Sequence, residues 1–368
     1  MANEFATLQT IARQALPRLI DNLVFPNLVY RDFSGEFSNQ GDTIQVRKPV
    51  TLEAREFDQA SGVDYEDITE RTVPVVLDKL VTVDAAATAV ETAVNIDDLN
   101  RAFIEPAVAA LAQKINADGL KLYAEVPYAV DASAHDLAAL AAVRRLMNVN
   151  RVPTGGRVAV WDPEADAAFA TIPAIVNAEK SGSSEALREG AIGRVFGLDN
   201  YMSQAVVSHR TGITAASGVK VAADVAAGAT KLNLSGTSLT GKLVKGDILT
   251  IAGRSYAVTE DTAAASGNAI SNVKVYPALP VLAANTEVVL AGSHVANLAF
   301  NPMAFAYVTR PLYNPDGEGV ASYVTSYNGV SLRVTKGYDQ KYKKSVYSMD
   351  VLYGYKAIYP ELAVRAMG

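Results

Sequence analysis

The run of residues 185–206, EALREGAIGRVFGLDNYMSQAV, constrains the fold of this chain more than any other segment. Its glycines, Gly190, Gly193 and Gly197, allow positive φ or a close backbone approach, and the polar residues between them suit a surface. This spacing predicts a surface turn that leads into a strand and argues against a catalytic loop. An ordinary helix-to-strand connection in an α/β protein is the alternative interpretation.

Composition excludes several classes of protein. With 368 residues, 49% of them hydrophobic, the chain can bury a large core, and its length favours two or three modules. A net charge of -6 argues against a dedicated nucleic-acid binder, which needs a basic surface. The absence of cysteine excludes disulfides, thiol nucleophiles and cysteine-based zinc sites. The segment MANEFATLQT lacks the features of a signal peptide, and no apolar run approaches about 18 residues, so we expect folding in a cytoplasm.

The N-terminal segment predicts an amphipathic helix from about Asn3, with Pro17 marking a break or a restart. Because this helix precedes the mixed core, we expect a neighbouring molecule to bury its apolar stripe. Removal of residues 1–19 should then leave a folded chain. The stripe consists of Phe5, Leu8, Ala12, Ala15, Leu16 and Leu19.

An acidic excursion over residues 51–72 separates two strand-like runs, TIQVRKPV and VPVVLDKLVTVDA. The two runs predict a long hairpin with the excursion at its tip. A loop of about twenty residues is uncommon in a compact domain unless it is functional, although a disordered acidic loop remains the alternative. We expect its carboxylates to contact Arg144, Arg145 and Arg151, or the turn at Lys341 to Lys344, in another subunit. The acids are Glu53, Glu56, Asp58, Asp64, Glu66, Asp67 and Glu70, opposed by Arg55 and Arg71.

Helix and strand signals alternate through the middle of the chain. Glu105 and Pro106 begin a predicted long helix that ends near Glu125, and a second helix is predicted over residues 136–148. The run RVAVWDPE predicts a strand that leads into a short helix at Pro163. This alternation is typical of a mixed α/β module.

Residues 211–292 differ in composition and carry short alternating runs such as LNLSG, DILTIAG and NVKVYPAL. They predict a small all-β barrel or sandwich whose two ends lie close together, inserted into a mixed fold. Near the C-terminus, VSLRVTK and SVYSMDVLYGYKAIY predict a hairpin with basic and aromatic residues about its turn.

No coherent catalytic set emerges. The segment from Gly236 to Lys242 approaches a phosphate loop, but Leu243 replaces the hydroxyl residue and a strand follows. His135, His209 and His294 match no metal spacing, so we expect caps, turns or surface positions for them. The pairs Asp97–Asp98 and Asp162–Glu164 are explained by helix capping. We therefore expect no catalysis, no cofactor and no metal.

The glycine-spaced run resembles a signature of the major capsid proteins of tailed double-stranded DNA phages. The turn signature is Arg188, Gly190, Gly193, Arg194 and Gly197, and the matching positions also include Leu187, Ile192, Asp199, Tyr201 and Ser203. The resemblance implies an α+β, HK97-like capsid fold of the podovirus-coat type with an inserted all-β domain. It implies an N-terminal arm (1–34), an extended loop (35–86), a peripheral domain with a spine helix (87–150 and 295–368), an axial domain (151–210) and an inserted β-barrel domain (211–294).

The same resemblance implies function and partners. The chain would assemble into hexamers and pentamers of an icosahedral shell around phage DNA, in the virion, after synthesis in the cytoplasm of a host bacterium. Implied partners are further copies of the chain, scaffolding protein, portal protein, a decoration protein and weakly contacted double-stranded DNA, with no membrane. An encapsulin-like compartment and an α/β enzyme are the alternatives. Candidate assembly contacts are Phe5, Leu8, Leu16, Leu19, Glu53, Glu56, Asp64, Glu66, Asp67, Glu70 and Arg71.

Overall fold

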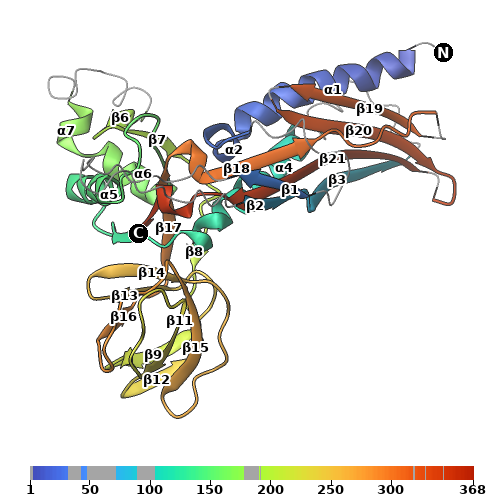
Figure 1. Cartoon of the computed structure of the whole chain (residues 1–368). Coiled ribbons are helices and arrows are strands. Elements are labelled where there is room, and N and C mark those ends of the chain that lie inside the picture. The colour runs from blue at the N-terminus through green and yellow to red at the C-terminus, as the bar shows by residue number, and fades with distance from the viewer. Residues whose placement is uncertain are drawn as a thin grey trace, which may run out of the picture.

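The computed structural model describes residues 3–31, 43–47, 72–88, 104–177, 190, 192–317, 320–327, 329–342 and 344–368. Three groups of elements are visible: a long sheet carrying helices, a mixed α/β region, and a small group of strands that projects away from both (Figure 1). The C-terminus lies near the point where the three groups meet.

The long sheet is antiparallel throughout. Strand β21 (Lys344–Ala357) lies at its centre, with β20 (Val330–Asp339) and β18 (Phe305–Arg310) along one side and β3 (Lys79–Thr88) along the other. Strand β19 (Ala321–Tyr327) pairs with β20. The predicted hairpin of β20 and β21 is confirmed, whereas no local pattern predicts the pairing of β3 with β21.

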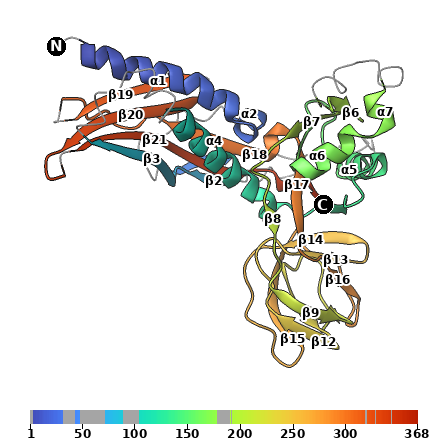
Figure 2. The same ribbon diagram turned by 180° about the vertical axis from the view of Figure 1, so that it is seen from behind.

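Two helices cover one face of this sheet (Figures 1 and 2). Helix α4 (Glu105–Leu120) continues as the 3-10 helix η3 (Lys121–Glu125), which confirms the predicted long helix. Pro106 lies in the first turn, where its missing N–H removes no intrahelical hydrogen bond, and the buried stripe of the helix includes Val108, Leu111 and Ile115. Inside the helix, a side chain at Gly119 would overlap the ring of Phe25, so the close approach of α2 (Phe25–Leu28) requires glycine there.

Helix α1 (Asn3–Asn22) lies beside α4 and packs over β19 and β20 of the same chain. It runs through Pro17 without a break because that ring lies on the exposed side, where water can satisfy the freed carbonyl. Ala12, Ala15, Leu16 and Leu19 are at most 3% exposed. The expectation that a neighbouring molecule buries this stripe is therefore wrong for these residues, because the sheet of the same chain covers them.

The opposite face of the sheet receives the hairpin of β1 (Thr43–Arg47) and β2 (Thr72–Val76), which confirms the predicted strand pair. Val75 and Leu77 pack there against Leu352 and Ile358. A side chain at Gly354 would overlap the carbonyl oxygen of Val76, so β2 crosses β21 at the one position without a Cβ. The acidic tip lies outside the described residues, including Glu53, Glu56, Asp64, Glu66, Asp67, Glu70 and Arg71.

The mixed region is built on a sheet of order β4–β22–β17–β5–β7–β6, with β8 (Ser208–His209) paired to β17. Helices α5 (Leu137–Val149), α6 (Pro163–Ala170) and α7 (Pro173–Val176) belong to this region. Asp136 caps α5, and Asp162 caps α6 as predicted. Short 3-10 turns η4 (Pro302–Ala304) and η5 (Pro360–Leu362) lead into later strands. The strands are β4 (Ala129–Asp131), β5 (Val158–Trp161), β6 (Arg194–Val195), β7 (Leu198–Met202), β17 (His294–Phe300) and β22 (Ala363–Met367).

The projecting group is all β and has its own core, which includes Leu234, Leu249, Ile251 and Val258. Its main sheet has the order β10–β11–β15–β14–β13–β16, and β9 pairs with β12. The chain enters through β8 and leaves through β17, which pair with each other, so the two ends lie close together as predicted. The strands are β9 (Ile213–Ser217), β10 (Lys220–Val221), β11 (Lys231–Ser235), β12 (Ser238–Gly241), β13 (Ile248–Ile251), β14 (Arg254–Val258), β15 (Ala269–Tyr276) and β16 (Val288–Leu290).

Candidate functional site

The glycine-spaced turn has the backbone that its sequence predicts. Gly190, Gly193 and Gly197 have φ of 69°, 67° and 80°, in the left-handed region that glycine adopts without strain. Arg194 is exposed, and its Nε lies 3.6 Å from Oδ1 of Asp199. Arg188 lies outside the described residues.

Asn200, which the sequence analysis did not single out, holds this turn against the region's core. Its Nδ2 donates to the carbonyl oxygens of Gly193 (2.8 Å) and Leu198 (3.1 Å). Its Oδ1 accepts a bond of 2.9 Å from the indole nitrogen of Trp161, a buried residue of β5. The turn is therefore anchored by side-chain bonds and presents Arg194 to solvent.

The predicted contacts of the N-terminal helix divide into two kinds. Leu16 and Leu19 lie in the chain's own core, at 3% and 0% exposure, so they are not available to a partner. Phe5 and Leu8 belong to the helix backbone that the structure describes, but their side chains lie outside the description.

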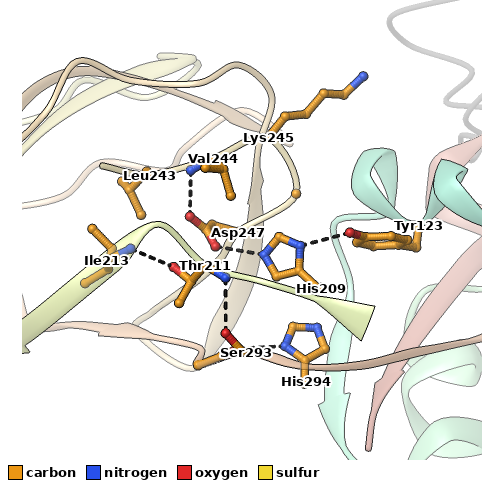
Figure 3. A network of polar contacts seen from close by, with 12 residues as sticks. Tyr123, His209, Thr211, Ile213, Leu243, Val244, Lys245, Asp247, Ser293 and His294 are labelled. Atoms are coloured by element: carbon orange, nitrogen blue, oxygen red, sulfur yellow. Dashed lines mark hydrogen bonds and ion pairs between the residues drawn. The ribbon is translucent and has the colours of Figure 1, made fainter. Parts of the chain in front are cut away.

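A buried polar network joins the projecting β group to the rest of the chain (Figure 3). Nε2 of His209 lies 2.8 Å from Oδ1 of Asp247, and its Nδ1 lies 3.0 Å from the hydroxyl of Tyr123. The other oxygen of Asp247 accepts a bond of 2.7 Å from the amide of Val244. The expectation that His209 occupies a cap, turn or surface is wrong, because partners 86 and 38 residues away enclose it.

Arg365 of β22 extends this network. Its side chain is fully buried, donates 2.6 Å to the carbonyl oxygen of Gly246 and 2.5 Å to that of Tyr123, and lies over the Tyr123 ring at 4.8 Å. Burial lowers the pKa of Arg365 to about 10, with Tyr123 and Asp247 opposing that shift, so the guanidinium stays charged at neutral pH.

His294 lies against His209, with ring centroids 5.2 Å apart, and its Nδ1 is 2.8 Å from the carbonyl oxygen of Gly292. Burial lowers the pKa of His294, and the charges of Arg365 and His209 act in the same direction. His135 lies at a turn as predicted, with φ of 45°.

The order tyrosine, histidine, aspartate resembles a proton-transfer chain, but its geometry does not suit catalysis. His209 and Asp247 are each 2% exposed, and Tyr123 is 9% exposed, so a substrate could not reach the imidazole. The network instead satisfies buried polar groups where two regions meet.

A second polar cluster fixes the spine helix. Asp118, 6% exposed, accepts bonds from Lys114 (3.1 Å), Lys121 (3.0 Å) and the hydroxyl of Tyr353 (3.0 Å). Burial alone would raise the pKa of Asp118, but these bonds and the charge of Lys79 outweigh it and lower the pKa.

Other chemistry receives no support from the part of the chain that is described. Within those residues no group of three or more His, Cys, Asp or Glu is arranged to hold a metal ion. No described helix has both the length and the apolar character to span a membrane. The segment that approaches a phosphate loop contains strand β12 and precedes β13, so no helix N-terminus faces it.

Comparison with known proteins identifies the fold. No protein-family model and no curated protein matches this sequence. A solved chain from Mycobacterium phage Che8 is 15% identical, with a TM-score of 0.53 over 94% of this chain and 90% of that one. A chain from the capsid of cyanophage P-SCSP1u is 13% identical, with a TM-score of 0.48 over 90% and 84%. A chain from the virus-like particle of Pyrococcus furiosus is 9% identical, with a TM-score of 0.40 over 98% of each chain. The chain has the α+β fold of the Mycobacterium phage Che8 chain, which agrees with the α+β fold class that the sequence resemblance predicted.

Proposed function

We propose that this capsid-fold chain is a major capsid protein, which assembles with copies of itself into hexamers and pentamers of an icosahedral shell around phage double-stranded DNA. The observation that carries the proposal is the fold that 94% of the chain shares with a chain of Mycobacterium phage Che8, together with the sequence resemblance to phage major capsid proteins. The long sheet with its projecting β group gives the chain an extended surface for contacts with other copies (Figure 1). Many modest contacts, repeated by symmetry, suffice to close a shell.

Partners follow from this role. Scaffolding protein, portal protein and a decoration protein are the proposed protein partners, and the virion is the proposed location after synthesis in a bacterial cytoplasm. The net charge of -6 favours weak, non-specific contact with the packaged DNA, because tight binding needs a basic surface.

The domain organisation of the chain, and the part that each domain has in assembly, are also proposals. The arm (1–34), extended loop (35–86), peripheral domain (87–150 and 295–368), axial domain (151–210) and inserted domain (211–294) would each contribute contacts between subunits. Phe5, Leu8 and the acidic tip of the loop remain candidate assembly contacts. Arg194, exposed on the turn held by Asn200, joins them.

We further propose that the chain is not an enzyme. Its most triad-like arrangement, Tyr123 with His209 and Asp247, is buried where the β group meets the long helix. This placement supports a structural role for the titratable residues that would otherwise suggest catalysis.

Electron microscopy of the purified full-length protein tests the proposal. Closed shells, and DNA-filled shells when the protein is made in an infected host, are the expected result. Small discrete oligomers under all assembly conditions would refute a shell protein. Shells filled with a specific cargo protein would instead favour a compartment.

A further inference from the structure

The described residues include a cleft of about 530 Å³ between the projecting β group and the mixed region. One wall is the last turns of α5, with Arg145 and Val149. The opposite wall is the hairpin of β13 and β14, with Arg254 and Tyr256, and Tyr128 lies beside the edge strand β4. Ligand-binding clefts in proteins have volumes of about 300 to 1,000 Å³, so this cleft is large enough to hold several side chains of a peptide.

The two arginines of this cleft have no acidic partner within the described part of the chain. Among the residues that the structure describes, neither Arg145 nor Arg254 forms an ion pair, and both are exposed. The charge of Arg254 acts to lower the pKa of both Tyr128 and Tyr256, against the larger effect of burial. Among the described residues, Glu361 also acts on Tyr128; its Oε1 accepts a bond from the hydroxyl of Tyr276, whereas its Oε2 is buried without a partner.

The cleft is equipped to donate hydrogen bonds. Burial raises the pKa of Tyr256 and of Tyr128, so both phenols keep their protons at neutral pH. Nδ2 of Asn150, which also lines the cleft, is a buried donor without a partner in the structure. Guanidinium groups, phenols and an amide together suit carboxylates, which arginine binds with two parallel bonds.

The charge of the chain indicates where such carboxylates come from. Residues 51–72 hold seven acids and two arginines, a net of -5 within a total of -6, so the rest of the chain is nearly neutral. A strongly acidic peptide of this length therefore exists in every copy, and the cleft presents the opposite charge.

We propose that the cleft between α5 and β14 receives the acidic segment 51–72 of a second copy of this chain. The inference rests on the proposed shell function. The sequence predicted that the acidic segment contacts either the arginines of residues 144–151 or the lysines of the turn at residues 341–344, and Arg145 of the first of these sites lines the cleft. Of the two sites, the turn near Lys341 joins β20 to β21, and Nζ of Lys341 lies 5.2 Å from the centroid of the neighbouring Tyr342 ring. Exposed lysines on such a turn contribute little, whereas two arginines facing one cleft can bind carboxylates more specifically.

Charge reversal in the full-length chain tests the cleft. The double variant Arg145→Glu, Arg254→Glu should lower the yield of shells by about tenfold or more, because at least two attractive pairs between the cleft and the acidic segment become repulsive. The matched control Arg144→Glu, Arg151→Glu makes the same change of charge beside the cleft and should assemble as the unaltered protein does. An unchanged melting temperature of unassembled subunits shows that the fold is intact. Equal assembly by both double variants would overturn the proposal.

Mixing two variants decides whether the segment comes from a second copy. Subunits with the reversed cleft, and separate subunits with Asp64→Lys, Glu66→Lys and Asp67→Lys, should each fail alone and recover shells when mixed. Recovery only when both sets of changes are in one chain would show that each segment binds its own cleft, against the proposal.

Direct binding separates this inference from the shell function. A labelled peptide of residues 51–72 is titrated by fluorescence anisotropy onto full-length subunits that carry the three lysine substitutions. We expect binding that weakens with salt and falls at least about tenfold with Arg145→Ala, Arg254→Ala. This measurement reports on the cleft even if the chain forms no shells. Peptide binding that is indifferent to both arginines would refute the site.

Discussion

Deletion of residues 1–19 should prevent the long sheet from folding. The deletion removes Ile11, Leu16 and Leu19, which are 3%, 3% and 0% exposed, together with buried alanines of the same stripe. Burial of each large side chain contributes about 1.5 to 3 kcal/mol, so the three together contribute about 5 to 9 kcal/mol. A typical domain has a net stability of about 5 to 15 kcal/mol, so the loss is comparable to the whole.

The deletion would also uncover the face of the sheet that α1 covers, where Val330, Leu332 and Val334 are buried. We expect truncated chains to aggregate, and hydrogen exchange of peptides from β19 and β20 to show little protection. This outcome differs from that expected of a detached arm, whose removal would impair assembly and leave the subunit folded.

A single substitution gives a graded version of the same test. Leu19→Ala should lower the free energy of unfolding by about 2 to 5 kcal/mol. Arg13→Ala, on the exposed side of the same helix, should change it by less than about 0.5 kcal/mol. Urea unfolding of unassembled subunits, followed by far-ultraviolet circular dichroism, measures both. A folded truncated chain with an unchanged melting temperature, or a Leu19→Ala effect no larger than that of Arg13→Ala, would refute the reasoning.

Three further predictions concern acid, a buried histidine and a glycine. The pKa of Asp118 in the folded state is lowered from 3.8, so the carboxylate stabilises the fold above that pH, and this stabilisation is lost as pH falls through the folded pKa. Asp118→Asn should lower the free energy of unfolding by about 1 to 3 kcal/mol at pH 7. In a series of melts at different pH, the variant should lose less stability in acid than the unaltered protein does. The pKa of His294 in the folded state is lowered from 6.5, so the unfolded chain binds a proton more readily, and the free energy of unfolding should decline as pH falls from about 6.5. His294→Asn should lessen that decline. A variant whose stability depends on pH as that of the unaltered protein does would contradict this prediction. Gly354→Ala should cost at least about 2 kcal/mol because its Cβ would overlap the Val76 carbonyl, whereas Gly337→Ala in β20 meets open space and should be tolerated in a thermal melt.

Elements with strong local signals were predictable. The helix that begins at Glu105 carries a first-turn proline and a buried apolar stripe, and both properties can be read from neighbouring residues. Strands β11, β13 and β15 lie on the alternating runs LNLSG, DILTIAG and NVKVYPAL that predicted them. The left-handed φ of Gly193 and Gly197 followed from their residue type and polar surroundings.

Long-range pairings were not predictable, because a local pattern does not say which surface covers an apolar stripe. Helix α1 is amphipathic whether a neighbour or its own sheet buries it. Half-buried Arg333 and buried Asp350, whose Nη2 and Oδ2 lie 2.6 Å apart across β20 and β21, look like two ordinary strand residues until the register is known. One signal was available for Arg365: a lone cation inside the apolar run AVRAM indicates a buried charge that needs partners.

The network around His209 bears on how the projecting β group is held. Two paired strands, β8 and β17, connect that group to the sheet, and by themselves they could act as a hinge. Arg365 donates to both Gly246 in the β group and Tyr123 at the end of the long helix, so rotation about the hinge would leave buried polar groups without partners. Each such group costs about 1 to 3 kcal/mol, whereas the exposed pair of Lys245 and Glu125 at the same junction contributes less than about 1 kcal/mol. The buried bonds therefore set the direction in which the β group projects, and they tie that direction to the position of the long helix.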